Sequence, residues 1–147
     1  SAGIHALGAL RLGLDREAWD FFLKSASLDL DTAQGGAAQG IHIAGCAANW
    51  QVAVHGFAGV RNALQGEALT LSPRLPAGWR RLAFPMVWRG VPLRIAITAG
   101  GCTVENGGAA GISLRVWRHA CRLEPGQTTS VTAPGPVRPD WAAATRG

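Results

Sequence analysis

The chain has 147 residues and a hydrophobic content of 48%, enough to fill the core of one ordinary domain or two small ones, which excludes a disordered protein. Its net charge of +5 suggests a protein that binds nucleic acid. However, thirteen of the fourteen basic residues are arginines, which are spread mostly singly along the chain and form no cluster with aromatic residues. We therefore expect no nucleic-acid partner. We expect no membrane association either, because no apolar run approaches the roughly 18 residues of a membrane span.

The cysteines and the start of the sequence indicate the cellular compartment of the protein and whether this sequence is part of a longer one. Cys46, Cys102 and Cys121 are too few and too widely spaced for a disulfide framework or a zinc site, which favours reduced thiols. No signal-peptide pattern opens the sequence, so we expect a cytoplasmic protein. The sequence begins at Ser1, without a methionine and inside a helical pattern, so we expect it to be part of a longer protein.

The first 61 residues have the spacing of helices. Apolar residues of Ile4–Leu12 recur near helical spacing, and Gly13 is typical of a helix end. A second helix is predicted to begin at once, with Asp15 as its N-cap. Because the link between them is so short, these two helices should pack antiparallel.

A third helix is predicted over residues 43–60, after a loop over 28–39 that is rich in glycine and polar residues. It is apolar nearly all round, which predicts that other helices surround it. The glycines at its end, Gly56 and Gly59, predict that it unwinds near Arg61.

From Ala68 the hydrophobic period changes from helical to two, which is typical of strands. Arg89-Gly90 should link a hairpin with one buried face, and the prolines and glycine of 73–79 predict an irregular corner. Short strands at this spacing predict a sandwich or barrel. The predicted strands are 68–72, 82–88, 91–97, 102–105, 112–118 and 121–123. From 127 to 147 the Thr, Ser, Ala, Pro and Gly content predicts a tail or linker.

His42 is the first residue that could carry chemistry, because it lies beside Gly40 at a predicted helix start. Two hypotheses stand: a buried or capping histidine satisfied by a backbone carbonyl, or an anion ligand helped by the helix dipole and free N–H groups. Asp29 and Asp31 are interpreted as loop and capping acids, and Cys46 as a packing residue. Three tryptophans allow either core packing, which we favour, or a sugar-stacking strip: Trp79, Trp88 and Trp117.

An ordered set of short motifs around and after His42 resembles the C-terminal part of family 65 glycoside hydrolases. These are the maltose, trehalose and kojibiose phosphorylases and their hydrolase relatives. In chain order the motifs are Gly40-Ile41-His42-Ile43-Ala44, Trp50, Gly56-Phe57 with Gly59 and Arg61, Leu71-Ser72-Pro73-Arg74-Leu75-Pro76, Trp79 and Trp88-Arg89-Gly90. The resemblance covers residues from about 4 to 126.

The resemblance implies an α+β fold in two parts. Residues 1–63 would be the last helices of an (α/α)6 catalytic barrel, and 64–126 a small antiparallel β-sandwich, leaving 127–147 as the tail. It also implies an inverting reaction in which phosphate attacks the anomeric carbon of an α-glucoside and releases β-glucose 1-phosphate. Inorganic phosphate is then a co-substrate beside the disaccharide, and neither a metal nor an organic cofactor is needed.

By the resemblance, His42 and Gly40 would bind the phosphate, with Gln39 and Asn49 in support. The general-acid glutamate of the family lies upstream of this motif, so we expect no catalytic residue in this chain and no activity from the chain alone. Asn49 departs from the family, which usually has threonine there, and this weakens the preference for phosphate over water.

Two alternative functions stay open: a trehalase-like hydrolase, and a non-catalytic carbohydrate-binding or structural sandwich module. The disaccharide linkage and the oligomeric state, a homodimer included, stay open as well.

Overall fold

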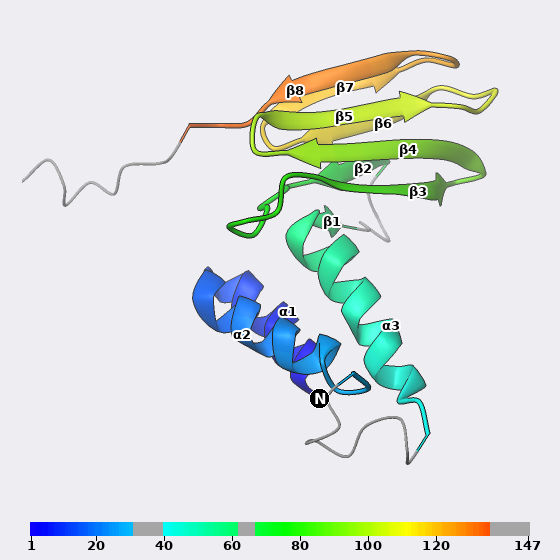
Figure 1. Cartoon of the computed structure of the whole chain (residues 1–147). Helices are drawn as coiled ribbons and strands as arrows, with labels where there is room; N and C mark the ends of the chain where they lie inside the picture. The colour runs from blue at the N-terminus through cyan, green and yellow to red at the C-terminus, as the bar shows by residue number, and fades with distance from the viewer. Residues whose placement is uncertain (31–39, 62–66, 136–147) are drawn as a thin grey trace, which may run out of the picture.

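The computed structural model describes residues 1–30, 40–61 and 67–135, with helices in the first part and strands in the second (Figure 1). The predicted α+β fold is therefore confirmed. Within the described residues no helix is long and apolar enough to cross a membrane. The helical elements are α1 (Ala2–Leu12), α2 (Asp15–Ala26), α3 (Ile43–Gln51) and the π-helical η3 (Val52–Phe57).

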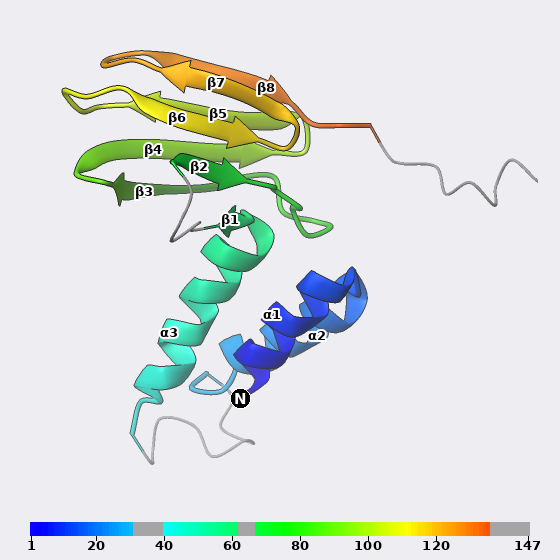
Figure 2. The ribbon, with the colours of Figure 1, turned by 180° about the vertical axis from the view of Figure 1, so that it is seen from behind.

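Helices α1 and α2 lie side by side in both views, as expected of two helices joined by two residues (Figures 1 and 2). Gly13 ends α1 in a left-handed conformation, with φ 77°, and its N–H donates to carbonyls of the last turn. The predicted N-cap is wrong by one residue: Leu14 is the N-cap and Asp15 is the first residue of α2. The Asp15 carboxylate instead accepts a hydrogen bond from Arg74 at 2.7 Å.

The continuous helix formed by α3 and η3 is buried on one side only. Val52 and Phe57 are buried against α1, α2 and the sandwich, whereas Ile43 and Trp50 are 79% and 58% exposed. Among the described helices only α1 and α2 pack beside it, so the expectation that other helices surround it is not met within this chain and stays a prediction for a longer protein. The predicted unwinding is confirmed, since the first strand begins at Val60.

Two four-stranded sheets stack face to face and form the sandwich (Figures 1 and 2). One has the order β1-β2-β6-β7 and the other β3-β4-β5-β8. The predicted hairpin is confirmed, with Trp88 paired to Val91 across the Arg89-Gly90 link. Alternate residues of the strands fill the core between the sheets, with the smallest contribution from the edge strand β8. The strands are β1 (Val60–Arg61), β2 (Ala68–Leu71), β3 (Leu82–Trp88), β4 (Val91–Thr98), β5 (Gly101–Asn106), β6 (Ile112–Val116), β7 (His119–Leu123) and β8 (Thr128–Thr132).

Two features of the sandwich differ from the prediction. Strand β2 pairs with β6 in parallel, with Ala68 opposite Ser113, so one pair departs from the antiparallel pattern. Strand β8 pairs with β5, so residues 128–132 belong to the sandwich rather than to a tail. Their composition hid this, because β8 is an edge strand that buries no large apolar side chain. The rest of the predicted tail, from 136 on, lies outside the described residues.

The helices join the sandwich through an aromatic cluster, which we define as Trp19, Phe22, Phe57 and Trp79. The ring centroids of the other three lie 5.5 to 6.0 Å from that of Trp79. Trp79 comes from the irregular corner before β3, and the corner is also held by a 2.7 Å bond from the Arg74 N–H to the Phe57 carbonyl. Trp79 thus packs inward, which favours core packing over a sugar-stacking strip.

The other two tryptophans of the hypothetical strip also face other groups. Trp88 is only 8% exposed and belongs to the sandwich core. The indole N–H of Trp117 donates to the Pro73 carbonyl at 3.1 Å. The core-packing alternative is therefore confirmed.

Candidate functional site

His42 is the N-cap of α3, and one carboxylate holds it in place. Its backbone N–H donates to both Asp29 oxygens, at 3.2 and 3.1 Å, and its ring Nδ1 lies 2.6 Å from Asp29 Oδ1. The two residues are thirteen positions apart in the sequence. The side chain of Asp29 is 19% exposed and that of His42 47%, so the acid is sheltered and the ring faces outward.

This geometry revises both hypotheses for His42. The partner of the ring is a carboxylate and not a backbone carbonyl, so the capping hypothesis had the wrong partner. An N–H group that the anion hypothesis left free is bonded to Asp29, whose negative charge already lies at the positive end of the helix dipole. The interpretation of Asp29 as a capping acid is confirmed.

The electrostatics of Asp29 follow from the same contacts. The hydrogen bond from the His42 ring, with a smaller contribution from the His42 N–H, holds the pKa of this carboxyl below its ordinary value of 3.8. Asp29 is therefore ionised near neutral pH and can only accept hydrogen bonds. Its partner Nδ1 must then carry the proton, and in the described part of the chain Nε2 has no hydrogen-bond partner.

The other predicted site residues are not gathered at His42. Gly40 is exposed and has φ 100°, two residues before the cap. Asn49 lies two helical turns further on, about 10 Å along the axis, and its Nδ2 donates to the Ser25 carbonyl at 3.4 Å. The buried Asn49 Oδ1 has no partner among the described residues. Gln39 and Asp31 lie outside the described residues.

Cys46 is a neighbour that the sequence did not predict. We expected packing, but the residue is exposed, and its sulfur lies 3.9 Å from Asp29 Oδ2. The other free cysteines are less accessible, and burial raises the pKa of the Cys102 thiol to about 11. No cluster of three or more potential metal-ligating residues occurs in the ranges that the structure describes.

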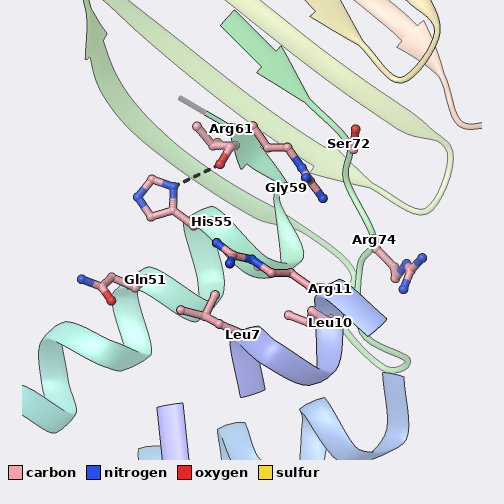
Figure 3. A pocket seen from close by; sticks show the side chains of 11 residues that line it. Leu7, Leu10, Arg11, Gln51, His55, Gly59, Arg61, Ser72 and Arg74 are labelled. Carbon is pink, nitrogen blue, oxygen red and sulfur yellow. Dashed lines mark hydrogen bonds between the residues drawn. The ribbon is translucent and has the colours of Figure 1, made fainter. Parts of the chain in front are cut away.

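A cavity of about 550 Å³ lies elsewhere, where the helices meet the sandwich (Figure 3). Arg11, Arg61 and Arg74 contribute to its wall from three separate elements. The His55 ring also lines it and is bonded to the Val60 carbonyl at 3.1 Å. Neither His42 nor Asp29 lines this cavity, so its positive charge is separate from the predicted phosphate site.

Comparison with known proteins decides the family. Residues 1–51 match the central catalytic domain of glycosyl hydrolase family 65, and residues 63–119 match the C-terminal domain of the same family. The chain belongs to glycoside hydrolase family 65. The two family 65 matches follow one another along the chain as the helices and strands do.

Curated family 65 relatives include two kojibiose phosphorylases. The protein of Caldanaerobacter subterraneus subsp. tengcongensis is 38% identical over 72% of this chain and 14% of its own length. That of Escherichia coli K12 is 35% identical over 79% of this chain and 15% of its own length. Other relatives are named for trehalose and maltose. The chain thus spans about a seventh of the length of these relatives.

A solved structure shows the same fold. It is described as a candidate kojibiose phosphorylase from the human microbiome, and it superposes with a TM-score of 0.81 at 22% identity. The match covers 94% of this chain and 20% of that protein. The arrangement of helices followed by a sandwich is therefore one that this solved structure also contains.

Proposed function

We propose that this chain is the C-terminal part of an inverting phosphorylase that cleaves an α-linked glucose disaccharide. The observation that carries the proposal is an outward-facing His42 with an unbonded Nε2, in the Gly-Ile-His sequence of a family 65 chain whose curated relatives include disaccharide phosphorylases. Phosphate binds at His42 and Gly40. Its oxygen attacks the anomeric carbon, and β-glucose 1-phosphate is released.

The rest of the reaction requires residues from outside this chain. An inverting mechanism needs an acid on the opposite face of the sugar, which protonates the departing glycosidic oxygen. Asp29 does not suit this role, because it is ionised and bonded to His42. We propose that the acid comes from the remainder of the barrel, so the chain alone is inactive.

The free thiols suit a reducing cytoplasm, where we propose that the enzyme works.

The charge on Asp29 limits how phosphate can bind. A phosphate placed directly against this carboxylate would be repelled, since like charges at short range are unfavourable. The His42 ring lies on Asp29 and is the more exposed partner, so it can separate the two anions. Phosphate therefore approaches from the Nε2 side of the ring.

A family 65 hydrolase is the second candidate, and Asn49 favours it. This residue replaces the family's usual threonine, and its amide is directed to the Ser25 carbonyl of α2 rather than towards His42. A weaker phosphate site would let water act as the nucleophile.

One assay on the complete enzyme separates the two candidates. Kojibiose, trehalose and maltose are each incubated with and without inorganic phosphate, and glucose and glucose 1-phosphate are measured. We expect phosphate-dependent cleavage of one of them with β-glucose 1-phosphate as product, and no effect of a metal chelator. Equal glucose release without phosphate would support the hydrolase instead.

Substitutions in the same enzyme test the role of His42. His42→Ala should raise the KM for phosphate more than the KM for the disaccharide, because in this proposal phosphate is the only one of the two substrates that the ring contacts. His55→Ala is the matched control, since this exposed histidine lies on the same continuous helix but lines the separate cavity. Equal kinetics of the two variants would argue against a phosphate site at His42.

A further inference from the structure

We infer that Asp29 is a positioning residue, which fixes the proton and the orientation of the His42 ring so that Nε2 is presented to phosphate. The identity of the ligand rests on the proposed function. The placement of the proton and of the ring rests on the geometry of this chain alone.

The contacts of Asp29 fix more than one degree of freedom of His42. The two bonds from the backbone N–H hold the main chain at the start of α3, and the 2.6 Å contact with Nδ1 holds the ring. A bond this short between a ring nitrogen and a carboxylate is typical of charge-assisted hydrogen bonds. A residue held at both its backbone and its ring has little freedom to rotate away from the ligand.

The chemistry of the carboxylate then decides which nitrogen meets the ligand. An ionised Asp29 cannot donate, so Nδ1 keeps its proton and points inward. Nε2 is left as the outward nitrogen: in the neutral ring it accepts a hydrogen bond from a phosphate hydroxyl, and in the protonated ring it donates one while Nδ1 donates to Asp29. Partners that orient a ligating histidine through its other nitrogen act in the same way at metal sites.

A purely structural role for Asp29 is the competing explanation. As a cap of α3, the carboxylate would stabilise the helix through the His42 N–H without any effect on the ring. The two roles differ in one measurable property, the protonation of Nδ1. A cap alone leaves the ring free to place its proton on Nε2.

The first test is a long-range proton–nitrogen NMR spectrum of this chain, labelled with nitrogen-15 and recorded without phosphate. His42→Ala identifies the His42 signals among the four histidines. We expect a protonated Nδ1 and an unprotonated Nε2 in the neutral ring. A neutral ring whose proton resides on Nε2 would overturn the inference with the unmodified chain alone.

Variants of the chain test whether Asp29 is the cause of the proton's position on Nδ1. Asp29→Ala should transfer the proton to Nε2, whereas Cys46→Ala, which removes a neighbour of Asp29 but not of the ring, should leave it on Nδ1. The backbone signals of α3 and of the sandwich check that each variant is folded, at the site as well as away from it. A folded Asp29→Ala chain with an unchanged ring signal would contradict the positioning role.

The complete enzyme provides the second test. Asp29→Ala should raise the KM for phosphate by about tenfold or more, the range seen when such orienting partners are removed, and leave the KM for the disaccharide unchanged. A phosphate-dependent enzyme with an unchanged phosphate KM in this variant would overturn the inference and leave the proposed function intact. A phosphate-independent enzyme would overturn the proposed function, while the NMR result would still decide the placement of the proton.

Discussion

At the scale of single residues, the sandwich depends on one buried amide. Asn106 has no exposed surface, and its side chain makes three hydrogen bonds within the fold. Its Nδ2 donates to the carbonyls of Ala110 and Leu123 at 2.9 and 3.0 Å, and its Oδ1 accepts from the Gly108 N–H at 2.9 Å. The side chain therefore ties the turn after β5 to the end of β7.

Replacing Asn106 by alanine should lower the free energy of unfolding by roughly 3 kcal/mol, because three bonds are lost and the buried Leu123 carbonyl loses a donor. Urea denaturation measures this. Thr103→Ala, in the same strand as Asn106, is the control. It removes an exposed bond to Ser130 of β8 and should lower the free energy of unfolding by less than about 1 kcal/mol. Equal costs for the two variants would show that burial of the amide does not matter.

The pair of Asp29 and His42 predicts a pH dependence of stability. Because the pKa of Asp29 is lowered in the folded chain, its stabilising contribution is complete above the unfolded value near 3.8 and is lost as the pH falls through the folded value. The difference in unfolding free energy between the chain and Asp29→Ala should therefore shrink in acid below that value.

Carboxyl carbon-13 NMR checks the cause of this shift. The titration of Asp29 should move up towards 3.8 in His42→Ala, because the ring provides the largest stabilisation of the ionised form. Identical titration curves in both chains would show that the ring is not responsible.

Sequence patterns predicted one half of the candidate site and not the other. His42 could be found because it lies in a recognisable motif at a helix start. Asp29 could be assigned only a local capping role, since no periodicity relates it to a residue thirteen positions away. The contact joins the end of one described segment to the start of the next, which is a property of the tertiary structure.

At the scale of elements, Gly59 controls the passage from η3 to β1. It has φ +62°, and a Cβ atom placed on it would collide with the backbone carbonyl of Ser72. The same two residues are bonded through the Ser72 N–H and the Gly59 carbonyl, at 3.1 Å. The helix can therefore pass directly into the sheet only with glycine at this position.

Gly59→Ala should lower the free energy of unfolding by about 3 kcal/mol or more, which combines the left-handed backbone with the displacement of a paired strand. Gly78→Ala is a matched control: it also has a positive φ, 89°, but a Cβ there meets nothing within 4 Å. Its expected cost is about 1 kcal/mol. Thermal unfolding of both variants compares them, and equal melting temperatures would exclude the steric contribution.

The elements themselves were predictable where one face is buried. Strand β4 alternates buried and exposed residues along Val91–Thr98, and its period of two is plain in the sequence. Strand β8 was missed because its Thr and Ser residues lie at an edge with little to bury. The parallel pairing of β2 with β6 was missed as well, since a strand pattern does not identify its partner.

At the scale of the whole molecule, the aromatic cluster is the main apolar contact between the helices and the sandwich. The nearby ion pair between Arg74 and Asp15 is 51% and 61% exposed, so solvent screens it. Trp79, by contrast, contacts rings from α2 and η3 at once. Dispersion and burial should therefore dominate this junction over charge.

Trp79→Ala should lower the free energy of unfolding by about 3 kcal/mol, at the low end for a buried tryptophan because Trp79 is half-buried. It should also split a single thermal transition into two, as the helices lose their contact with the sandwich. Asp15→Asn is the control and should cost less than about 1 kcal/mol. A single transition for Trp79→Ala, at an unchanged temperature, would contradict this account.

The parallel pairing of β2 with β6 has a consequence for the order of folding. Strands β3, β4 and β5 follow one another as hairpins, so their contacts are local and can form early. Strand β2, however, pairs on one edge with the short β1 just before it and on the other edge with β6, about 45 residues later, with Ala68 opposite Ser113. During synthesis β2 therefore leaves the ribosome with only the two-residue β1 beside it, and its other edge stays unpaired until β6 follows.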